Sequence, residues 1–425
     1  MSAAEAHDED DGLEVVTFGC RLNAYESDQA LARARADGLS NAVIFNTCAV
    51  TGEAVRQARQ AIRKARRQRP DAQLIVTGCA AQIDPDAFAA MTEVDAVIGN
   101  GLKSAKGAYA ADALATRVRV NDMASLKETA GHLTHASVAE RARAYVEVQN
   151  GCDHRCTFCI IPFGRGDSRS APAGEVVSAV RGLVESGYNE VVLTGVDISA
   201  WGADLPGAPS LGQLVSRILK LVPELPRLRL SSIDAAEIDQ DLLLCFAREE
   251  RLAPYLHLSL QAGDDLILKR MKRRHSRADA LKLVADVRAV RPDVAFGADF
   301  IAGFPTESET AFQATLDLVA EADLAYVHAF PFSPRPGTPA ARMPQLDRGV
   351  VKARAERLRA AGSEAMDRWL QRQIGREVLA VVERPGRARA PDFTEIAFEG
   401  EAASGSLARI AIHGQADGRA LGRLV

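Results

Sequence analysis

The chain has 425 residues, 47% of them apolar, which predicts two or three folded domains with substantial cores and excludes a disordered chain. Its net charge is only -4, so a nucleic-acid partner cannot be inferred from the total charge and would need a local basic patch. No apolar stretch approaches the ~20 residues that cross a bilayer, and the acidic residues 1–12 do not resemble an export signal, so we expect a cytoplasmic protein without a membrane partner.

Short apolar runs alternate with helical stretches between residues 14 and 101. Strands are predicted at residues 15–18, 43–45, 74–76 and 94–98. This alternation is typical of a parallel α/β sheet. We therefore predict an amino-terminal α/β domain over residues 12–103, followed by a linker over residues 104–141 where the periodicity fades.

A second alternating series predicts an α/β barrel over residues 142–371. Its strands are expected at residues 146–149, 191–194, 228–231, 256–260, 298–302 and 326–330. Six strand-helix units favour a partial (βα)6 barrel over an open sheet, and a charged helix over about residues 348–372 ends the domain. Residues 372–425 contain short strand-like runs separated by Gly, Pro and Asp, which predicts a small all-β domain.

Seven cysteines in a chain of this kind favour metal binding or catalysis over disulfides. Cys152, Cys156 and Cys159 follow the first barrel strand with the spacing C-x-x-x-C-x-x-C. Thiolates this close in sequence can hold one iron-sulfur cluster. A structural zinc site would need a fourth ligand, either His154 or a distant residue, and is therefore disfavoured. Three ligands leave one iron open for a substrate.

Cys20, Cys48 and Cys79 each follow a predicted strand of the first domain. The carboxyl ends of parallel strands lie along one edge of a sheet, so these three thiols can converge and hold a second cluster. The alternative is three structural cysteines, but Gly19 and Gly78 indicate exposed turns before two of them. Cys245 lies in an apolar helical run and is expected in a core.

The spacing of Cys152, Cys156 and Cys159 on the first loop of a six-unit barrel resembles the radical S-adenosylmethionine (SAM) superfamily. Residues 19–23, 46–51 and 77–79, which read GCRLN, NTCAVT and TGC, resemble the amino-terminal domain of the methylthiotransferase family. The terminal β domain resembles a TRAM module. The match extends over nearly the whole chain.

This resemblance implies two 4Fe-4S clusters and SAM as cofactors. The barrel cluster would bind the amino and carboxylate groups of SAM and generate a 5′-deoxyadenosyl radical, and the auxiliary cluster on Cys20, Cys48 and Cys79 would supply or carry sulfur. It also implies a low-potential electron donor such as flavodoxin or ferredoxin. The residues implied in SAM binding are Phe158, Thr194, Gly195, Asp197, Ser259, Gln261 and Asp299.

The family has three main branches, and residues 19–23, 159–166 and 328–343 look most like the branch that acts on threonylcarbamoyladenosine, MtaB. The expected reaction is conversion of N6-threonylcarbamoyladenosine beside the tRNA anticodon to its 2-methylthio derivative. Alternatives are isopentenyladenosine in tRNA, a ribosomal-protein aspartate, or a non-catalytic two-cluster electron carrier. The chain departs from its relatives at Phe163-Gly164, where they have an aromatic residue followed by Ala or Thr before the arginine, and in its short, nearly neutral terminal domain.

Two basic runs are candidates for RNA contact through phosphates. Arg56, Arg59 and Arg63 share a predicted helix between the second and third cysteines of the first domain. An exposed, solvated helix face explains that run equally well. Lys272, Arg273 and Arg274 follow the fourth barrel strand, near the predicted barrel mouth.

Overall fold

The computed structural model describes residues 11–126 and 141–425, which divide into two compact units. Unit 1 comprises the described residues of Met1–Ala136, Gln149–Ala171 and Ser333–Thr338. Unit 2 is drawn from Ser137–Val148, Pro172–Phe332 and Pro339–Val425. The segment with the first cysteine triplet thus packs with the amino-terminal residues, although in sequence it follows the first barrel strand.

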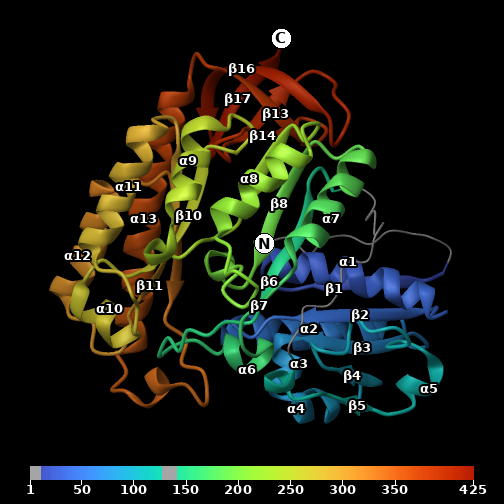
Figure 1. Ribbon diagram of the computed structural model, residues 1–425. Helices are drawn as coiled ribbons and strands as arrows, with labels where there is room; N and C mark the ends of the chain where they lie inside the picture. Colours follow the sequence, from blue (N-terminus) through green and yellow to red (C-terminus); the bar gives the residue numbers. More distant parts are fainter. Residues whose placement is uncertain (1–10, 127–140) are drawn as a thin grey trace. The chain divides into compact units, whose positions relative to one another are not determined.

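Unit 1 contains a parallel sheet in the order β1-β2-β3-β4-β5, drawn in blue to cyan in Figure 1. Its strands are β1 (Leu13–Thr17), β2 (Ala42–Thr47), β3 (Gln73–Gly78), β4 (Ala96–Ile98) and β5 (Val118–Arg119). The four predicted strands are confirmed as β1 to β4. The fifth lies in the predicted linker and pairs with β4. It escaped prediction because two residues carry no recognisable periodicity.

Helices cover both faces of this sheet. They are α1 (Arg21–Ala36), α2 (Gly52–Gln68), α3 (Cys79–Ile83), α4 (Pro85–Ala89) and α5 (Ala111–Leu114). Val43 and Phe45 of β2 pack in one apolar cluster with α2, α3 and α4, while Ile44 packs in another with α1 and α5. Successive side chains of a strand point to opposite faces, so burial on both faces requires the continuous apolar runs seen in the sequence.

The rest of unit 1 builds a loop between two short strand segments. The last residues of β6 (Ala144–Asn150) pair antiparallel with β7 (Arg169–Ser170). The cysteines of the first triplet and helix α6 (Ile161–Arg165) lie between these segments. Helix α6 packs against α3.

Unit 2 contains the predicted partial barrel. Strands β6, β8 (Glu190–Gly195) and β9 (Arg227–Leu230) form one sheet, and β10 (Tyr255–Gln261), β11 (Ala295–Ala302) and β12 (Tyr326–Pro331) form another. Parallel bridges from Leu228 to Leu252 and from Ile233 to Leu258 connect the two sheets. All six predicted barrel strands are therefore confirmed, in sequential order.

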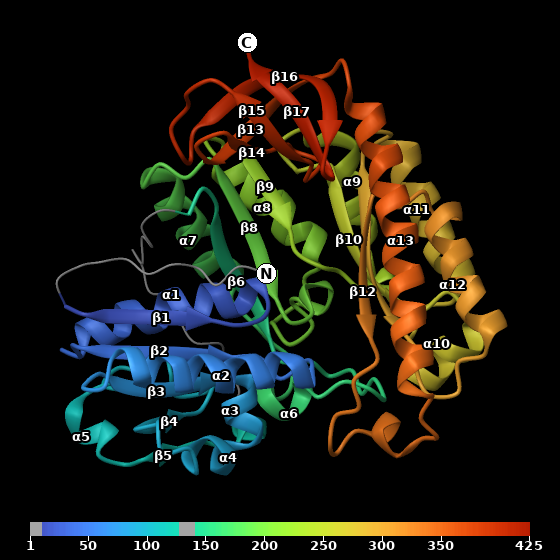
Figure 2. The ribbon, with the colours of Figure 1, turned by 180° about the vertical axis from the view of Figure 1, so that it is seen from behind.

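Helices lie along the outside of these strands (Figure 2). They are α7 (Ala173–Glu185), α8 (Leu211–Leu221), α9 (Gln240–Arg248), α10 (Asp265–Met271), α11 (Arg277–Val290), α12 (Glu309–Glu321) and α13 (Arg348–Gln373). Helix α13 is the predicted charged helix. Cys245 of α9 is buried, as predicted, and its thiol donates to the Gly212 carbonyl at 3.6 Å. In the part of the chain that the structure describes, no helix combines the length and apolar character needed to cross a membrane.

The carboxyl-terminal residues form the predicted small β domain. Five strands close into a barrel in the order β13-β14-β15-β17-β16. They are β13 (Glu377–Arg384), β14 (Arg387–Arg389), β15 (Glu395–Glu399), β16 (Leu407–Ala416) and β17 (Arg419–Leu424). Leu370 of α13 packs into the core of this barrel, which attaches it to the end of that helix.

A buried ion cluster connects the (βα)6 strands with the β domain inside unit 2. Glu190 and Arg229 are both 0% exposed and pair at 2.7 Å, and Arg227 lies 3.2 Å from the same carboxylate. Arg229 also donates to the carbonyls of Ala390 and Pro391. Because these charges are paired and hydrogen-bonded, they can be accommodated in the interior.

Candidate active site

The loop that carries Cys152, Cys156 and Cys159 is held closed at its base. Gly151 has φ +75°, and a Cβ there would lie 1.8 Å from the Asp167 carbonyl oxygen, so only glycine fits. The Gln149 side chain donates to the Gly151 carbonyl at 2.8 Å and to Ser168 Oγ at 2.9 Å. The loop therefore starts from a fixed backbone position.

Further contacts fold the loop onto itself. The Cys152 amide donates to the Gly166 carbonyl at 3.0 Å, and the Cys159 amide donates to the Cys156 carbonyl at 3.1 Å. Arg155 pairs with Asp167 at 2.8 Å across the base. All three thiols are half-exposed on this one short loop. Three accessible sulfur ligands on a supported loop are a donor set that fits an iron-sulfur cluster.

The structure places the other three cysteines where parallel strands of unit 1 end, as predicted. Cys20 caps the start of α1, Cys48 follows β2 directly, and Cys79 is the first residue of α3 after β3. Gly19 has φ +100°, and a Cβ there would lie 2.8 Å from Cys48 Sγ. The absence of a side chain at Gly19 lets the Cys20 turn approach Cys48 closely.

The electrostatics of these three thiols favour a cationic ligand. Cys48 and Cys79 are buried, and Cys20 is exposed as a whole residue although its thiol lies in a desolvated environment. Burial, together with negative charge on Cys79 and Cys20, raises the pKa of Cys48 to about 12. Burial of the thiol also raises the pKa of Cys20, and the positive charge of Arg165 opposes that rise. A metal cluster binds thiolates and supplies the positive charge that relieves this repulsion, so the donor set fits a cluster.

A buried polar cluster beside these thiols was not predicted from the sequence. Glu26 of α1 accepts from Lys103 at 2.6 Å and from Arg165 of α6 at 2.7 Å, and all three side chains are buried. Asn100 joins them by accepting from Lys103 at 2.8 Å. The only available signal was the position of Arg165 shortly after Cys159, because Glu26 and Lys103 lie in ordinary polar patterns.

Six of the seven residues implied in SAM binding lie on unit 2. Thr194, Gly195 and Asp197 lie at or just after the end of β8, and Ser259 and Gln261 lie at the end of β10. Gln261 has φ +71° next to a register shift in the β10-β11 pairing. Such strained backbone at a strand end is often associated with a ligand site. Phe158, half-buried on the cysteine loop, belongs to unit 1.

Asp299 of β11 is engaged in a hydrogen-bond chain. Its Oδ1 lies 2.9 Å from His257 Nε2 and 3.1 Å from His328 Nδ1, and His257 Nδ1 lies 2.9 Å from the Tyr255 hydroxyl. Burial opposes ionisation, but the two imidazoles hold the pKa of Asp299 well below its usual range. Asp299 is therefore an ionised, fixed acceptor, and a ligand would compete with His328, the exposed end of the chain.

The candidate RNA contacts on α2 are partly neutralised by acidic neighbours. Arg56 makes two bonds with Glu53, at 2.9 and 2.6 Å, and Arg63 lies 3.9 Å from Glu93. Arg59 lies over the Phe88 ring at 5.4 Å. These contacts favour the interpretation of this run as an ordinary helix face.

The second basic run divides into three different environments. Arg273 is buried and donates to Asp234 at 2.8 Å and to the Ser259 carbonyl at 2.7 Å. It is not available to a phosphate, so its proposed RNA contact is corrected to a structural role. Arg274 is half-exposed and paired with Glu237. Lys272 ends α10 with φ +59° and stays exposed, so it is the best placed of the three.

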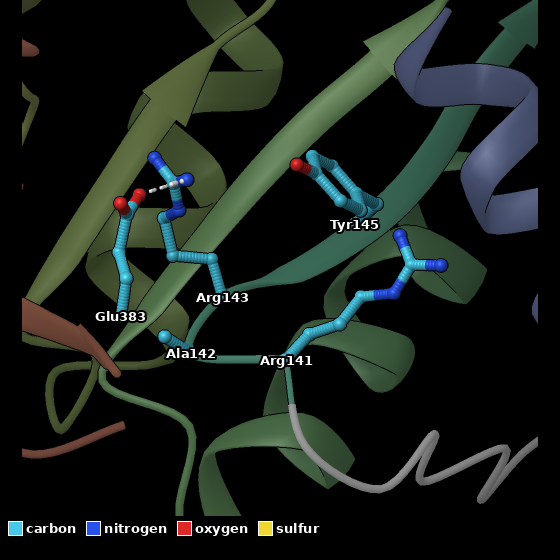
Figure 3. Close-up of a pocket in the computed structure, with 5 residues that line it drawn as sticks. All are labelled: Arg141, Ala142, Arg143, Tyr145 and Glu383. Carbon is cyan, nitrogen blue, oxygen red and sulfur yellow. Dashed lines mark hydrogen bonds and ion pairs between the residues drawn. The ribbon is translucent and has the colours of Figure 1, made fainter. Parts of the chain in front are cut away.

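A shallow hollow of about 190 Å³ lies in unit 2 between the start of β6 and the β domain (Figure 3). Arg143 and Glu383 pair there at 2.6 Å, and Arg141 lies 6.0 Å from the Tyr145 ring. The Arg143 charge is thus balanced, and none of the residues predicted to bind a cofactor or RNA lines the hollow.

Comparison with known proteins identifies the family. The radical SAM superfamily profile matches residues 146–319, and the profile described as uncharacterized protein family UPF0004 matches residues 13–99. The threonylcarbamoyladenosine tRNA methylthiotransferase MtaB of Rickettsia prowazekii (strain Madrid E) is 50% identical, over 95% of this chain and 96% of that protein. The chain belongs to the methylthiotransferase family of radical SAM enzymes. Iron-sulfur and SAM cofactors follow from this membership.

Two further relatives are less similar to this chain. MtaB of Aquifex aeolicus (strain VF5) is 34% identical, over 93% of this chain and 98% of that protein. The tRNA-2-methylthio-N(6)-dimethylallyladenosine synthase of Cereibacter sphaeroides (strain ATCC 17029 / ATH 2.4.9) is also 34% identical, over 88% of both chains. Within the family, similarity to the Rickettsia protein thus exceeds similarity to this dimethylallyladenosine enzyme.

Among solved structures, the radical S-adenosylmethionine methyltransferase TsrM from Kitasatospora setae superimposes with a TM-score of 0.53. The match covers 74% of this chain and 68% of TsrM at 15% identity. It supports the fold of this methylthiotransferase and nothing further.

Proposed function

We propose that this methylthiotransferase converts N6-threonylcarbamoyladenosine beside the anticodon of tRNA to its 2-methylthio derivative. The observation that carries the proposal is the 50% identity, over nearly the full length of both chains, to a protein named for this activity. The two cysteine triplets in one compact unit support it, because the reaction needs both radical chemistry and sulfur handling.

In this proposal each segment has a distinct task. Residues 12–103 carry an auxiliary 4Fe-4S cluster on Cys20, Cys48 and Cys79. Residues 104–141 connect this segment to the next and also contribute α5 and β5 to it. Residues 142–371 carry the radical SAM cluster on Cys152, Cys156 and Cys159. Residues 372–425 form the TRAM-like domain. When bound, the clusters and SAM supply the radical and the sulfur.

Residues of the chain would bind and orient these cofactors. Phe158 would contact the SAM adenine, and the strand-end residues named above would orient the rest of SAM. A flavodoxin or ferredoxin would provide low-potential electrons. Lys272 would contribute a phosphate contact, since it is exposed and unneutralised by any ion pair among the described residues.

The substrate is tested by mass spectrometry of tRNA nucleosides from cells that lack the gene. We expect loss of 2-methylthio-N6-threonylcarbamoyladenosine and accumulation of its unthiolated parent, with isopentenyladenosine derivatives unchanged. Loss of the methylthio group from isopentenyladenosine instead would assign the chain to that branch. Unchanged tRNA together with a ribosomal protein that lacks one methylthio group would assign it to the ribosomal branch.

The two clusters are tested separately by cysteine replacement. Anaerobically reconstituted protein should hold about eight irons, four for each cluster. Changing Cys152, Cys156 and Cys159 to Ala should remove half of the iron and all SAM cleavage. Changing Cys20, Cys48 and Cys79 to Ala should also remove half of the iron but leave 5′-deoxyadenosine formation without methylthiolated product. Full product from the second variant would reduce those cysteines to structural residues.

A further inference from the structure

We infer that Arg165 is a positioning residue that fastens the radical SAM loop to the auxiliary thiols and places a positive charge beside them. The inference rests on the proposed auxiliary cluster, and it concerns residues of unit 1 only. Arg165 ends helix α6, six positions after Cys159 in the sequence, so it moves with the loop that carries the first cysteine triplet.

The guanidinium of Arg165 is held by residues that follow Cys20. It is 2% exposed, and it donates from Nη1 to Glu26 Oε1 at 2.7 Å and from Nη2 to Glu26 Oε2 at 2.8 Å. Nη2 also donates to Asn23 Oδ1 at 2.7 Å. This two-pronged geometry uses the planar fork that distinguishes arginine from lysine, so it fixes orientation as well as distance.

The same contacts bring the charge of Arg165 close to a sulfur ligand. The Cys20 thiol donates to Asn23 Oδ1 at 3.8 Å, so the sulfur and the guanidinium share one acceptor atom. In a buried site a neighbouring cation stabilises negative charge far more than it would in water. After Glu26, the nearest groups that can carry a balancing negative charge are the thiolates and a cluster bound to them.

A second contact reaches Cys79 from the neighbouring residue. Asn100 Nδ2 donates to the Gly164 carbonyl at 2.7 Å and lies 3.6 Å from Cys79 Sγ. A Cβ on Gly164 would lie 3.3 Å from the Cys79 carbonyl oxygen and 3.4 Å from Cys79 Cβ, so α6 packs directly on the Cys79 backbone. The dipeptide Gly164-Arg165 therefore contacts the surroundings of two auxiliary cysteines.

The charge balance distinguishes this arrangement from an ordinary buried ion pair. Glu26 is already paired with Lys103, which is 1% exposed and lies 2.6 Å away. Arg165 is a second cation on the same carboxylate, so this group of three carries one excess positive charge. Uncompensated buried charge is costly. Thiolates at Cys20 and Cys79 would provide the missing negative charge once a cluster is bound.

The test uses full-length protein in which Cys152, Cys156 and Cys159 are replaced by Ala, so that only the auxiliary cluster contributes to the spectra. Adding Arg165→Gln should lower the reduction potential of the auxiliary cluster, measured by a redox titration followed by electron paramagnetic resonance. Reduction adds negative charge to the cluster, and Arg165 no longer stabilises it. Arg165→Lys should keep the potential near that of the parent. Lys103→Met is the matched control, since it removes an equally buried cation from the same carboxylate. Lys103 bonds to Glu26 and Asn100 and not directly to α6. The shift in Lys103→Met should be the smaller.

Positioning is tested in protein with both cysteine triplets intact. Displacement of a reacting group by about 1 Å can lower a rate by roughly 100-fold, so Arg165→Gln should lower methylthiolated product per 5′-deoxyadenosine about 10- to 100-fold. Arg165→Lys keeps the charge but loses the fork, and should recover part of this loss. If Arg165→Gln fails to fold, Glu26→Gln with Arg165→Gln removes both charges and takes its place in each assay.

Two failures are distinguishable. A parent that lacks Cys152, Cys156 and Cys159 and holds no iron would refute the auxiliary cluster, and this inference with it. A parent with about four irons, in which Arg165→Gln leaves potential and product ratio unchanged, would refute the role of Arg165 alone. Equal potential shifts in Arg165→Gln and Lys103→Met would also refute it, because they would reflect only the disturbed carboxylate.

Discussion

Replacing Gly151 by Ala should release the cluster of the first cysteine triplet without unfolding the protein. Gly151 has φ +75°, a conformation that costs an L-residue about 1–2 kcal/mol. Its added Cβ would also lie 1.8 Å from the Asp167 carbonyl oxygen and 2.9 Å from that of Gly166. A relaxed carbon-oxygen contact is about 3.3 Å, so the backbone must separate by roughly 1.5 Å. Cys152 is the next residue, and its amide is bonded to the Gly166 carbonyl that must move.

Gly107 provides the matched control. It has φ +76°, and a Cβ there would have no neighbour within 4 Å. Gly107→Ala therefore has the same backbone strain without the collision. It should lower thermal stability by a few degrees and leave the cofactors in place.

The assay is iron content and 5′-deoxyadenosine formation in the two variants after anaerobic reconstitution. We expect Gly107→Ala to match the parent in both. Gly151→Ala should lose about four irons and most SAM cleavage while keeping the auxiliary cluster. Unchanged iron and SAM cleavage in Gly151→Ala would mean that the base of the loop does not position Cys152, and would refute the reasoning.

Three other predictions follow from single side chains. Phe163 is 58% exposed four residues after Cys159, and stacking of a base on an aromatic ring is worth about 1–3 kcal/mol. Phe163→Ala should therefore raise the KM for tRNA roughly tenfold, while Phe163→Tyr should not. Equal KM values for the parent and Phe163→Ala would exclude stacking. Lys272→Glu should fold normally and weaken tRNA binding in filter assays, more strongly at low salt. Arg273→Glu should instead lower the free energy of unfolding by about 3–5 kcal/mol, because Arg273 pairs with buried Asp234. A stable Arg273→Glu protein would contradict the structural role of Arg273. Burial opposes ionisation of Glu190, but Arg229 and its neighbours lower the pKa of Glu190 to about 2. The stabilisation by the Glu190 carboxylate is therefore present above pH ~4.5 and is lost as the pH falls through about 2. A melting temperature that stays constant over this pH range in calorimetry would refute this.

Most of the fold could be predicted because its signals are local. The buried strands of unit 1 are continuous apolar runs, and the barrel strands recur between helical stretches. The cysteines could be placed for the same reason, since Cys20, Cys48 and Cys79 each follow a strand within three residues. The other triplet starts two residues after β6. Strand β5 could not be predicted, because its two residues are ordered by pairing with β4 and not by their own pattern.

The polar cluster around Glu26 could not be predicted because its members meet only in three dimensions. Glu26 and Lys103 are 77 positions apart, and Glu26 and Arg165 are 139 apart. Arg273 illustrates the opposite error. A run of basic residues suggested phosphate contacts, but sequence does not reveal which side chain turns inward to meet Asp234. Surface runs of like charge therefore need a structure before they can be assigned to a ligand.

The assignment of Gln149–Ala171 to unit 1 has a consequence for modularity. The chain enters and leaves this unit repeatedly, so no single cut would separate a free-standing radical SAM enzyme from a removable sulfur-handling module. A fragment that starts at residue 142 would keep Cys152, Cys156 and Cys159 but lose α1 and α3, against which α6 and Arg165 are packed. If recombination exchanged only the first hundred residues between distant relatives, the new residues would have to pack against the existing α6. We therefore expect the two cysteine triplets to be inherited together.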